Sequence, residues 1–169
     1  MAASTLVLLV FAFLAAAPQA PGRPAGTQPR RDYSTFNVCQ AVPGETIARA
    51  FGGKLSEARP VFDKSFSRCR YFIELPGGTR AGYIVWMQPP EDFEELKQYI
   101  EEPRTALTGL GDGAYMFHDK GDGRFKINVL KRGDLMFQAS GESAESARKV
   151  ADAVAAHLWK TAAPARLPL

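Results

Sequence analysis

Residues 124–160 read RFKINVLKRGDLMFQASGESAESARKVADAVAAHLWK, and this stretch decides the fold because strand patterns and a helix pattern follow each other in it. A strand is expected over 124–131, where apolar residues alternate as in a half-buried antiparallel strand. The segment 135–140 predicts another strand, and the RGD tripeptide between the two predicts a hairpin turn. From 143 to 160 the apolar residues recur every three or four positions, which predicts a closing helix.

Similar patterns extend toward the N-terminus. The segment 42–53 (VPGETIARAFGG) predicts a short helix that ends at the double glycine. Segments 68–75 and 80–88 are rich in aromatic and β-branched residues, and the PGGT between them predicts a hairpin. The segment 89–103 begins and ends on proline and carries acids in its first turn, which favours a second helix. A further strand is expected over 114–118.

This order is helix, two strands, helix, three strands, helix (αββαβββα). No helix interrupts either group of strands, so the sheet should be mainly antiparallel, with the helices packed on it. We therefore predict one α+β domain over residues 33–160, built on a five-stranded sheet.

The two ends of the chain differ from this domain. Leu6–Ala17 is an unbroken apolar run, shorter than a membrane span, so residues 1–20 are expected to be a signal peptide. No Lys or Arg precedes the run, and an uncleaved leader is the alternative, which would be the only route to membrane contact. Residues 21–32 are rich in proline, glycine and arginine and predict a linker, and 161–169 predict a flexible tail.

The charge is distributed unevenly between the domain and the ends. Residues 33–160 contain 17 basic and 17 acidic side chains, whereas the whole chain has a formal net charge of +3. A nucleic-acid-binding domain would concentrate basic charge on the fold itself. Nucleic acid is therefore not an expected partner.

Cys39 and Cys69 are the only cysteines, thirty positions apart. A zinc site would need further ligands, and His118 and His157 fall in separate predicted elements, so no metal site is expected. A structural disulfide is expected if the compartment is oxidising; in a reducing cytoplasm the two residues would be buried thiols.

The densest group of polar residues is GLGDGAYMFHDKGDGRF, residues 109–125. Asp112 and Asp122 each lie between glycines, as turns require, and the calcium-loop pattern of alternating ligands and a distant glutamate is missing. His118 and Asp119 are neighbours in a predicted strand and would point to opposite faces, so they cannot form a dyad. No catalytic residue and no cofactor is predicted.

Three motifs carry a resemblance: VCQAVPGETIARAFGGKL (38–55), CRY (69–71) and LTGLGDGAY (107–115). They are similar to the pattern of small exported bacterial domains of unknown function, many of them envelope lipoproteins, that contain two cysteines and a Gly-Leu-Gly-Asp-x-Ala-Tyr segment. The resemblance implies an α+β fold, a bond between Cys39 and Cys69, and no known activity or cofactor. The chain departs from the lipoproteins because no cysteine ends its leader, so lipid anchoring is not expected.

These observations favour an exported, non-catalytic module of the cell envelope that binds a partner protein or envelope component through a sheet face or an exposed strand edge. Its localisation would be extracytoplasmic, either periplasmic or secreted. One alternative is a binder or sensor of a small apolar molecule, with a cavity beneath Tyr83, Trp86 and Phe117. Another is a hydrolase centred on His118, which would need a serine and a carboxylate beside it. Tyr83, Trp86, Phe117 and His118 are the candidate ligand-binding residues.

Overall fold

The computed structural model describes residues 32–131 and 135–161 of the chain. The predicted signal peptide, the predicted linker up to residue 31, the RGD turn and the tail from residue 162 lie outside the described residues. Those predictions are therefore not tested by the structure.

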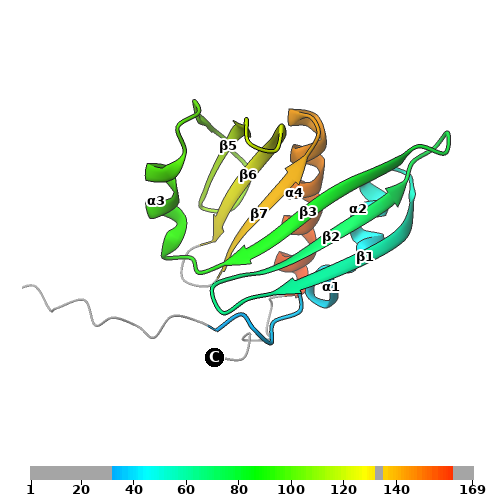
Figure 1. The fold of residues 1–169 in the computed structure, drawn as a ribbon, viewed down its shortest axis with the longest axis horizontal. Helices are drawn as coiled ribbons and strands as arrows, with labels where there is room; N and C mark the ends of the chain where they lie inside the picture. Colours follow the sequence, from blue (N-terminus) through cyan, green and yellow to red (C-terminus); the bar gives the residue numbers. More distant parts are fainter. Residues whose placement is uncertain (1–31, 132–134, 162–169) are drawn as a thin grey trace, which may run out of the picture.

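One antiparallel sheet organises the described residues (Figure 1). Its strands are β1 (Lys54–Phe62), β2 (Ser67–Glu74), β3 (Arg80–Gln88), β4 (Thr105–Ala106), β5 (Gly113–Asp119), β6 (Arg124–Lys131) and β7 (Leu135–Gly141). Their order in the sheet is β1-β2-β3-β7-β6-β5-β4. The predicted α+β class and antiparallel sheet are confirmed. The predicted count of five strands and the predicted order αββαβββα are wrong, because the described residues form seven strands in the order ααβββαββββα.

The two unpredicted strands, β1 and β4, lie at the edges of the sheet. In β1 the alternation is broken by a bulge between Leu55 and Glu57, and Pro60 adds a residue that strands rarely contain. Strand β4 has only two residues and both are exposed, so it carries no hydrophobic pattern. Neither strand could therefore be recognised from periodicity.

The helices are α1 (Val38–Ala41), α2 (Gly44–Ala50), α3 (Asp92–Leu96) and α4 (Ala144–Thr161), with a 3₁₀ turn, η1 (Lys97–Tyr99), after α3. The helix predicted over 42–53 is in fact two short helices. They are separated at Pro43, since the residue before a proline disfavours helical geometry. The helix predicted over 89–103 ends early, because Ile100 is already extended.

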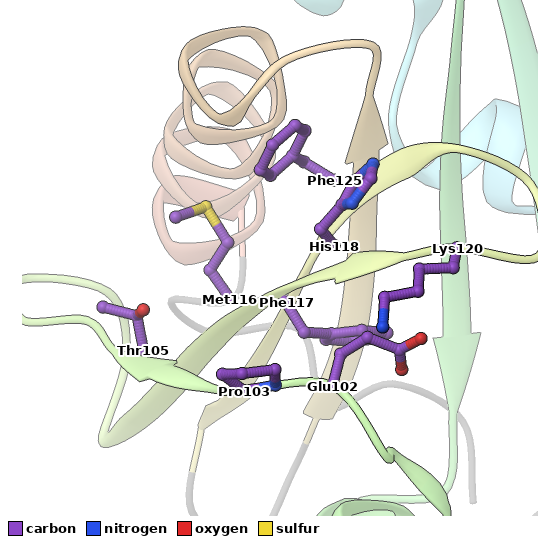
Figure 2. Close-up of a pocket in the computed structure, with 8 residues that line it drawn as sticks. All are labelled: Glu102, Pro103, Thr105, Met116, Phe117, His118, Lys120 and Phe125. Carbon is purple, nitrogen blue, oxygen red and sulfur yellow. The ribbon is translucent and has the colours of Figure 1, made fainter.

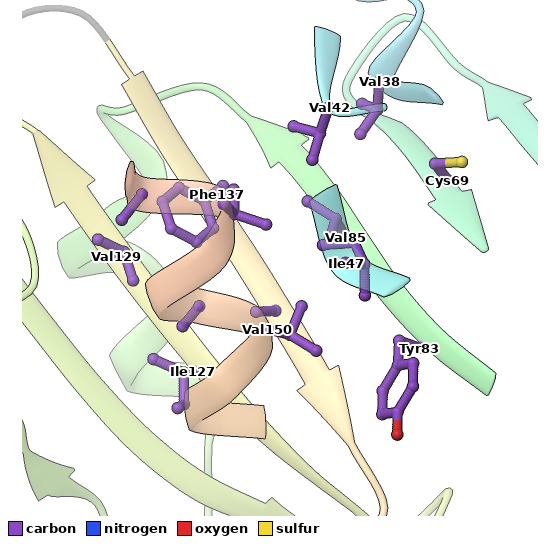
Figure 3. Packing of buried hydrophobic residues seen from close by; sticks show 14 of the residues in the cluster. Val38, Val42, Ile47, Cys69, Tyr83, Val85, Ile127, Val129, Phe137 and Val150 are labelled. Atoms are coloured by element: carbon purple, nitrogen blue, oxygen red, sulfur yellow. The ribbon is translucent and has the colours of Figure 1, made fainter. Parts of the chain in front are cut away.

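Helices α1, α2 and α4 pack on one face of the sheet, which we call the inner face, and enclose the main core (Figure 3). Ile127, Val129 and Phe137 from the sheet and Val150 from α4 are buried there. On the opposite, outer face, Phe93 of α3 is buried in a smaller cluster with Tyr115, Phe117 and Met136. The sheet is thus covered by three helices on its inner face and by one helix on part of its outer face.

The predicted disulfide is present and joins Cys39 of α1 to Cys69 of β2, with a Cα–Cα distance of 5.2 Å. Beside it, the Tyr71 hydroxyl donates a hydrogen bond to the carbonyl oxygen of Val42 at 2.7 Å. Burial raises the pKa of Tyr71 far above its ordinary value, so the hydroxyl stays a donor. The bond and the hydroxyl together fix α1 against the sheet.

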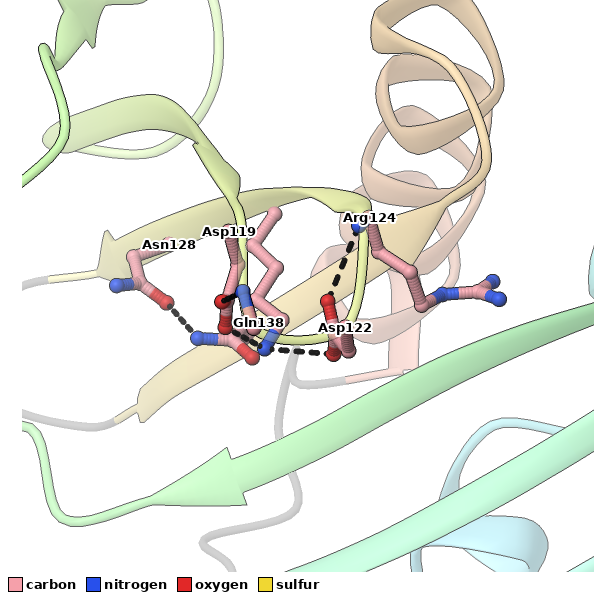
Figure 4. Close-up of polar contacts among 7 residues, drawn as sticks. Asp119, Asp122, Arg124, Asn128 and Gln138 are labelled. Atoms are coloured by element: carbon pink, nitrogen blue, oxygen red, sulfur yellow. Dashed lines mark hydrogen bonds and ion pairs between the residues drawn. The ribbon is translucent and has the colours of Figure 1, made fainter.

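The glycine-rich segment forms turns, as predicted. Gly111 has a positive φ of 59°, and the Asp112 amide donates to the carbonyl oxygen of Leu130 at 2.9 Å. In the loop between β5 and β6, the Asp122 carboxylate accepts a hydrogen bond from the Arg124 amide at 3.0 Å (Figure 4). The Asp122 carboxylate thus helps to hold the turn between β5 and β6.

Candidate functional site

The strand register assigns side chains to the outer face. Trp86 of β3 is the cross-strand partner of Gln138, which in turn pairs with Asn128, and Asn128 pairs with Tyr115. Directly opposite residues share a face, so these four side chains form one row across four strands. The row lies on the face away from α4, because Tyr115 belongs to the cluster under α3.

Hydrogen bonds connect three side chains of this row, Gln138, Asn128 and Tyr115. The Gln138 amide donates to the Asn128 carbonyl oxygen at 2.9 Å (Figure 4). The Asn128 amide donates to the Tyr115 hydroxyl at 2.7 Å. Burial raises the pKa of Tyr115, and the bond from Asn128 opposes that rise only in part. Gln138, Asn128 and Tyr115 therefore form a neutral polar network.

A groove of about 270 Å³ runs between this row and the α3 segment. Trp86, Leu96 and Phe117 contribute apolar walls, and Gln138 and Asn128 contribute polar atoms. The groove also contains Gln88, whose side-chain oxygen is buried and has no hydrogen-bond partner among the described residues. Its volume lies below the range of roughly 300–1,000 Å³ that is usual for small-molecule pockets.

Lys126 is the basic residue that lines the groove, and two carboxylates neutralise its charge. Its ammonium group forms ion pairs with Asp119 and, at 2.9 Å, with Asp122. Burial lowers the pKa of Lys126, but the two carboxylates outweigh burial and hold that pKa above its ordinary value. Lys126 therefore supports the β5–β6 hairpin and leaves no free charge for a ligand.

The structure brings two pairs of the predicted ligand-binding residues together, Trp86 with Phe117 and Phe117 with His118, but it does not bring all four into one site. Trp86 and Phe117 line the groove, whereas Tyr83 lies in the main core on the inner face and stacks on Phe51 with ring centroids 4.3 Å apart. No common cavity lies beneath Tyr83, Trp86 and Phe117 in the described residues. His118 is exposed beside Phe125, at 4.6 Å between ring centroids, and it lines with Phe117 a second hollow of about 290 Å³ (Figure 2).

The half of the outer face formed by β1, β2 and β3 is not covered by any helix among the described residues (Figure 1). We call it the bare half. Its outward side chains are Lys54, Glu57, Arg59, Val61, Arg68, Arg70, Phe72, Glu74, Arg80, Ile84 and Trp86. Five of these are basic and two are acidic, a surplus of three positive charges on a domain that is neutral as a whole.

Arginines lie over aromatic rings on the bare half. The guanidinium groups of Arg59 and Arg80 lie 5.1 Å and 4.4 Å from the centre of the Phe72 ring. Glu57 forms ion pairs with both, and the hydrogen bonds, that from Arg59 above all, lower the pKa of Glu57. These contacts hold the two guanidinium groups in place, as cation–π stacking does elsewhere.

Two further arginines on the bare half have no ion pair within the described residues. The Arg68 guanidinium lies 5.0 Å from the centre of the Trp86 ring, and Trp86 stacks on Phe66 at 4.9 Å. Arg70 is exposed and lies directly opposite Arg59. Sequence reasoning missed this surface; the available signal was the alternation of Arg68 and Arg70, whose meaning depends on knowing which face the helices cover.

The exposed edges of the sheet are protected against strand addition. Pro60 lies in the edge strand β1 and has no amide hydrogen to offer, and Arg59 next to it adds charge. The opposite edge, β4, is only two residues long. The sequence predicted that a partner binds either a sheet face or an exposed strand edge. The edges are protected against pairing with another strand, so the structure favours the sheet face.

The fold and the outer face together define a disulfide-bonded α+β domain with an arginine-rich, half-covered sheet. Comparison with known protein families, curated proteins and solved structures found no match to this chain. The resemblance to exported two-cysteine domains therefore stays a prediction. Within residues 32–131 and 135–161, no three His, Cys, Asp or Glu side chains are grouped as metal ligands. In the same ranges, no helix has both the length and the apolar character needed to span a membrane.

Proposed function

We propose that the protein is an exported, non-catalytic module of the cell envelope that binds a macromolecular partner through the bare half of its sheet. The observation that carries this proposal is the set of arginines there: Arg68 and Arg70 have no ion pair in the described residues, and Arg59 and Arg80 share one glutamate. Arginines and aromatic rings are the residues most enriched at protein interfaces.

The shape of this surface supports a large partner. The bare half is a sheet face without an enclosing wall, and the adjacent groove of about 270 Å³ is small and open. A small ligand would gain little burial there. A macromolecule can instead cover the whole face.

The disulfide supports an extracytoplasmic location. Cys39 and Cys69 are bonded and Cys69 is fully buried. Disulfides of this kind persist in oxidising compartments and are rare in the cytoplasm. This agrees with the predicted signal peptide, which lies outside the described residues.

Site-specific crosslinking tests the proposal. We would place a photo-crosslinking amino acid at Arg70, and at Asp152 on α4 as a control that is exposed on the other side of the molecule. In the cells that make the protein, crosslinked products are expected from position 70 and not from position 152. Equal products from both positions, or none from position 70, would reject the bare half as the binding surface.

A second candidate, binding of a small aromatic molecule in the groove, is favoured by one observation. The Gln88 side-chain oxygen, which has no hydrogen-bond partner in the described part of the chain, belongs to the same groove as Trp86 and Phe117, so a flat ring with one N–H donor would satisfy it. Indole should then shift the NMR signals of these residues more strongly than benzofuran, which lacks the donor. Equal shifts would remove this candidate. The hydrolase alternative has no such support, since the His118 imidazole makes no hydrogen bond or ion pair within the described residues.

A further inference from the structure

We propose that the partner on the bare half is a second copy of this chain, and that the outer faces of two copies associate about a two-fold axis parallel to the strands. This inference rests on the proposed binding surface and names its occupant. It follows from three properties of the outer face: its shape, its charge and its exposed aromatic residue.

The outer face has the shape of a step. Over β5, β6 and β7 it carries the segment 91–104, which we call the ridge and which contains α3 and η1 (Figure 1). Phe93 is buried beneath the ridge, and Arg104 donates hydrogen bonds to the carbonyl oxygens of Lys97 and Ile100 at 2.7 Å and 2.8 Å, which fixes its C-terminal part. Rotation by half a turn about an axis along the step places the ridge of each copy on the bare half of the other.

The two halves of the step carry opposite charge. The ridge contains the acidic residues Glu91, Asp92, Glu94, Glu95, Glu101 and Glu102. Its basic residues are Lys97 and Arg104, so the ridge has a surplus of four negative charges, whereas the bare half has a surplus of three positive charges. In the two-fold arrangement each positive half faces a negative ridge, and this complementarity is satisfied twice.

The ridge also offers an exposed aromatic side chain. Tyr99 is 72% exposed, more than any other large hydrophobic side chain among the described residues. It lines the groove at the foot of the step, beside Leu96 and Ile100. Tyrosine is among the residues that contribute most to binding when an interface buries them.

The area is sufficient for a stable contact. Three strands of about eight residues cover roughly 14 Å by 26 Å, or about 370 Å². The bare half and the ridge together would then bury on the order of 700 Å² on each copy, close to the roughly 800 Å² per partner of an ordinary protein interface.

Other anionic occupants fit the step less well. A flat anionic bilayer or a long nucleic acid placed on the bare half would also meet the acidic ridge that stands beside it. Repulsion from Glu94 and its neighbours would oppose such contact. A protein surface that carries a positive and a negative region side by side avoids this repulsion. The outer face of a second copy of this chain is such a surface.

Charge reversal provides the test. The method is sedimentation velocity on the oxidised full-length chain. The unaltered protein should form more dimer as its concentration rises. Its dimerisation affinity should fall at least tenfold at high salt, since salt screens the charged contacts. R68E/R70E and E94R/E101R should each weaken homodimerisation at least tenfold. An equimolar mixture of the two variants should restore dimers. In the mixed dimer the reversed bare half of one variant faces the reversed ridge of the other, and the unaltered ridge of the first faces the unaltered bare half of the second. R49E, an exposed reversal on α2, is the control and should have no effect.

The outcomes separate this inference from the proposed function. Circular dichroism of each variant confirms that loss of the dimer is not loss of the fold. If the unaltered protein stays monomeric at every concentration while position 70 still crosslinks to a different protein, the second copy is rejected and the binding surface stands. If neither is observed, both proposals fail. Dimers that R68E/R70E leaves unchanged would place the interface elsewhere and overturn the inference.

Discussion

Arg59 of β1 and Arg70 of β2 are direct cross-strand partners on the bare half of the sheet. Two like charges in this position destabilise a sheet, by up to about 1 kcal/mol relative to neutral pairs. Glu57 compensates Arg59 through a hydrogen bond of 2.9 Å, but Arg70 has no ion pair within the described residues. A local arrangement that costs stability is typical of a functional surface.

Replacing Arg70 should therefore stabilise the domain. We expect Arg70→Thr to raise the free energy of unfolding by roughly 0.5 kcal/mol at low salt, since it removes the repulsion and adds a good strand former. Urea denaturation at low and high salt measures this, and the gain should shrink as salt screens the charges. Arg68→Thr is the control: it also removes a positive charge but loses the contact with Trp86, so it should give no gain. A destabilised Arg70→Thr variant would show that Arg70 serves the fold.

The disulfide should supply a large share of the stability. Cys39 and Cys69 are thirty positions apart, and closing a loop of that length is worth roughly 3 to 4 kcal/mol in the chain-entropy account. The Cys39→Ala/Cys69→Ala variant should lose about this much in urea denaturation. The unaltered protein should shift similarly when it is reduced, and reduction should leave the double variant unchanged. Equal stability of the oxidised and reduced forms would show that α1 is held mainly by packing and by Tyr71.

Much of the fold was predictable because its central elements have regular patterns. Strand β6 matches its predicted range of 124–131, and α4 differs from its predicted range by one residue at each end. These elements are packed on one continuous core, so their periodicity is undisturbed. The errors lie where local features override the pattern: the bulge and Pro60 in β1, Pro43 between α1 and α2, and the two-residue β4.

The candidate site was less predictable, because it depends on which face of the sheet is covered. Tyr83 and Trp86 are three positions apart in one strand, so they point to opposite faces, and a single cavity beneath both was not possible. The pairing of Trp86 with Phe117 in one groove needed the strand order, which places β7 and β6 between β3 and β5. The bare half could not be predicted for a related reason, because the sequence does not show that α3 covers only part of the outer face.

The resemblance motif LTGLGDGAY has a structural role that can be tested at Gly111. Gly111 has a φ of 59°, and a Cβ atom there would lie 2.3 Å from the carbonyl oxygen of Leu130. Gly111→Ala should therefore destabilise the domain by at least about 2 kcal/mol, combining backbone strain with a backbone clash. Gly123→Ala is the matched control, since Gly123 has a φ of 69° but open space around it, and should cost about 1 kcal/mol. Thermal or urea denaturation compares the two, and equal losses would mean that the close approach to Leu130 contributes nothing.

The ion pair between Asp119 and Lys126 should make stability depend on pH at both extremes. The hydrogen bond from Lys126 lowers the pKa of Asp119 below its ordinary value of 3.8, so the contribution of Asp119 is complete above about pH 5 and is lost as the pH falls through the lowered pKa. The pKa of Lys126 is raised above 10.5, so its contribution is present below that value and is lost as the pH rises through the raised pKa.

Asp119→Asn should consequently destabilise the domain by roughly 1 kcal/mol between about pH 5 and 9, and by progressively less outside that window. Urea denaturation of both proteins across the pH range gives this difference directly. Asp152→Asn removes an exposed partner of Arg148 and should show a smaller effect. A difference between the Asp119→Asn variant and the unaltered protein that stays constant to pH 2 would mean that the charge of Asp119 does not contribute to stability.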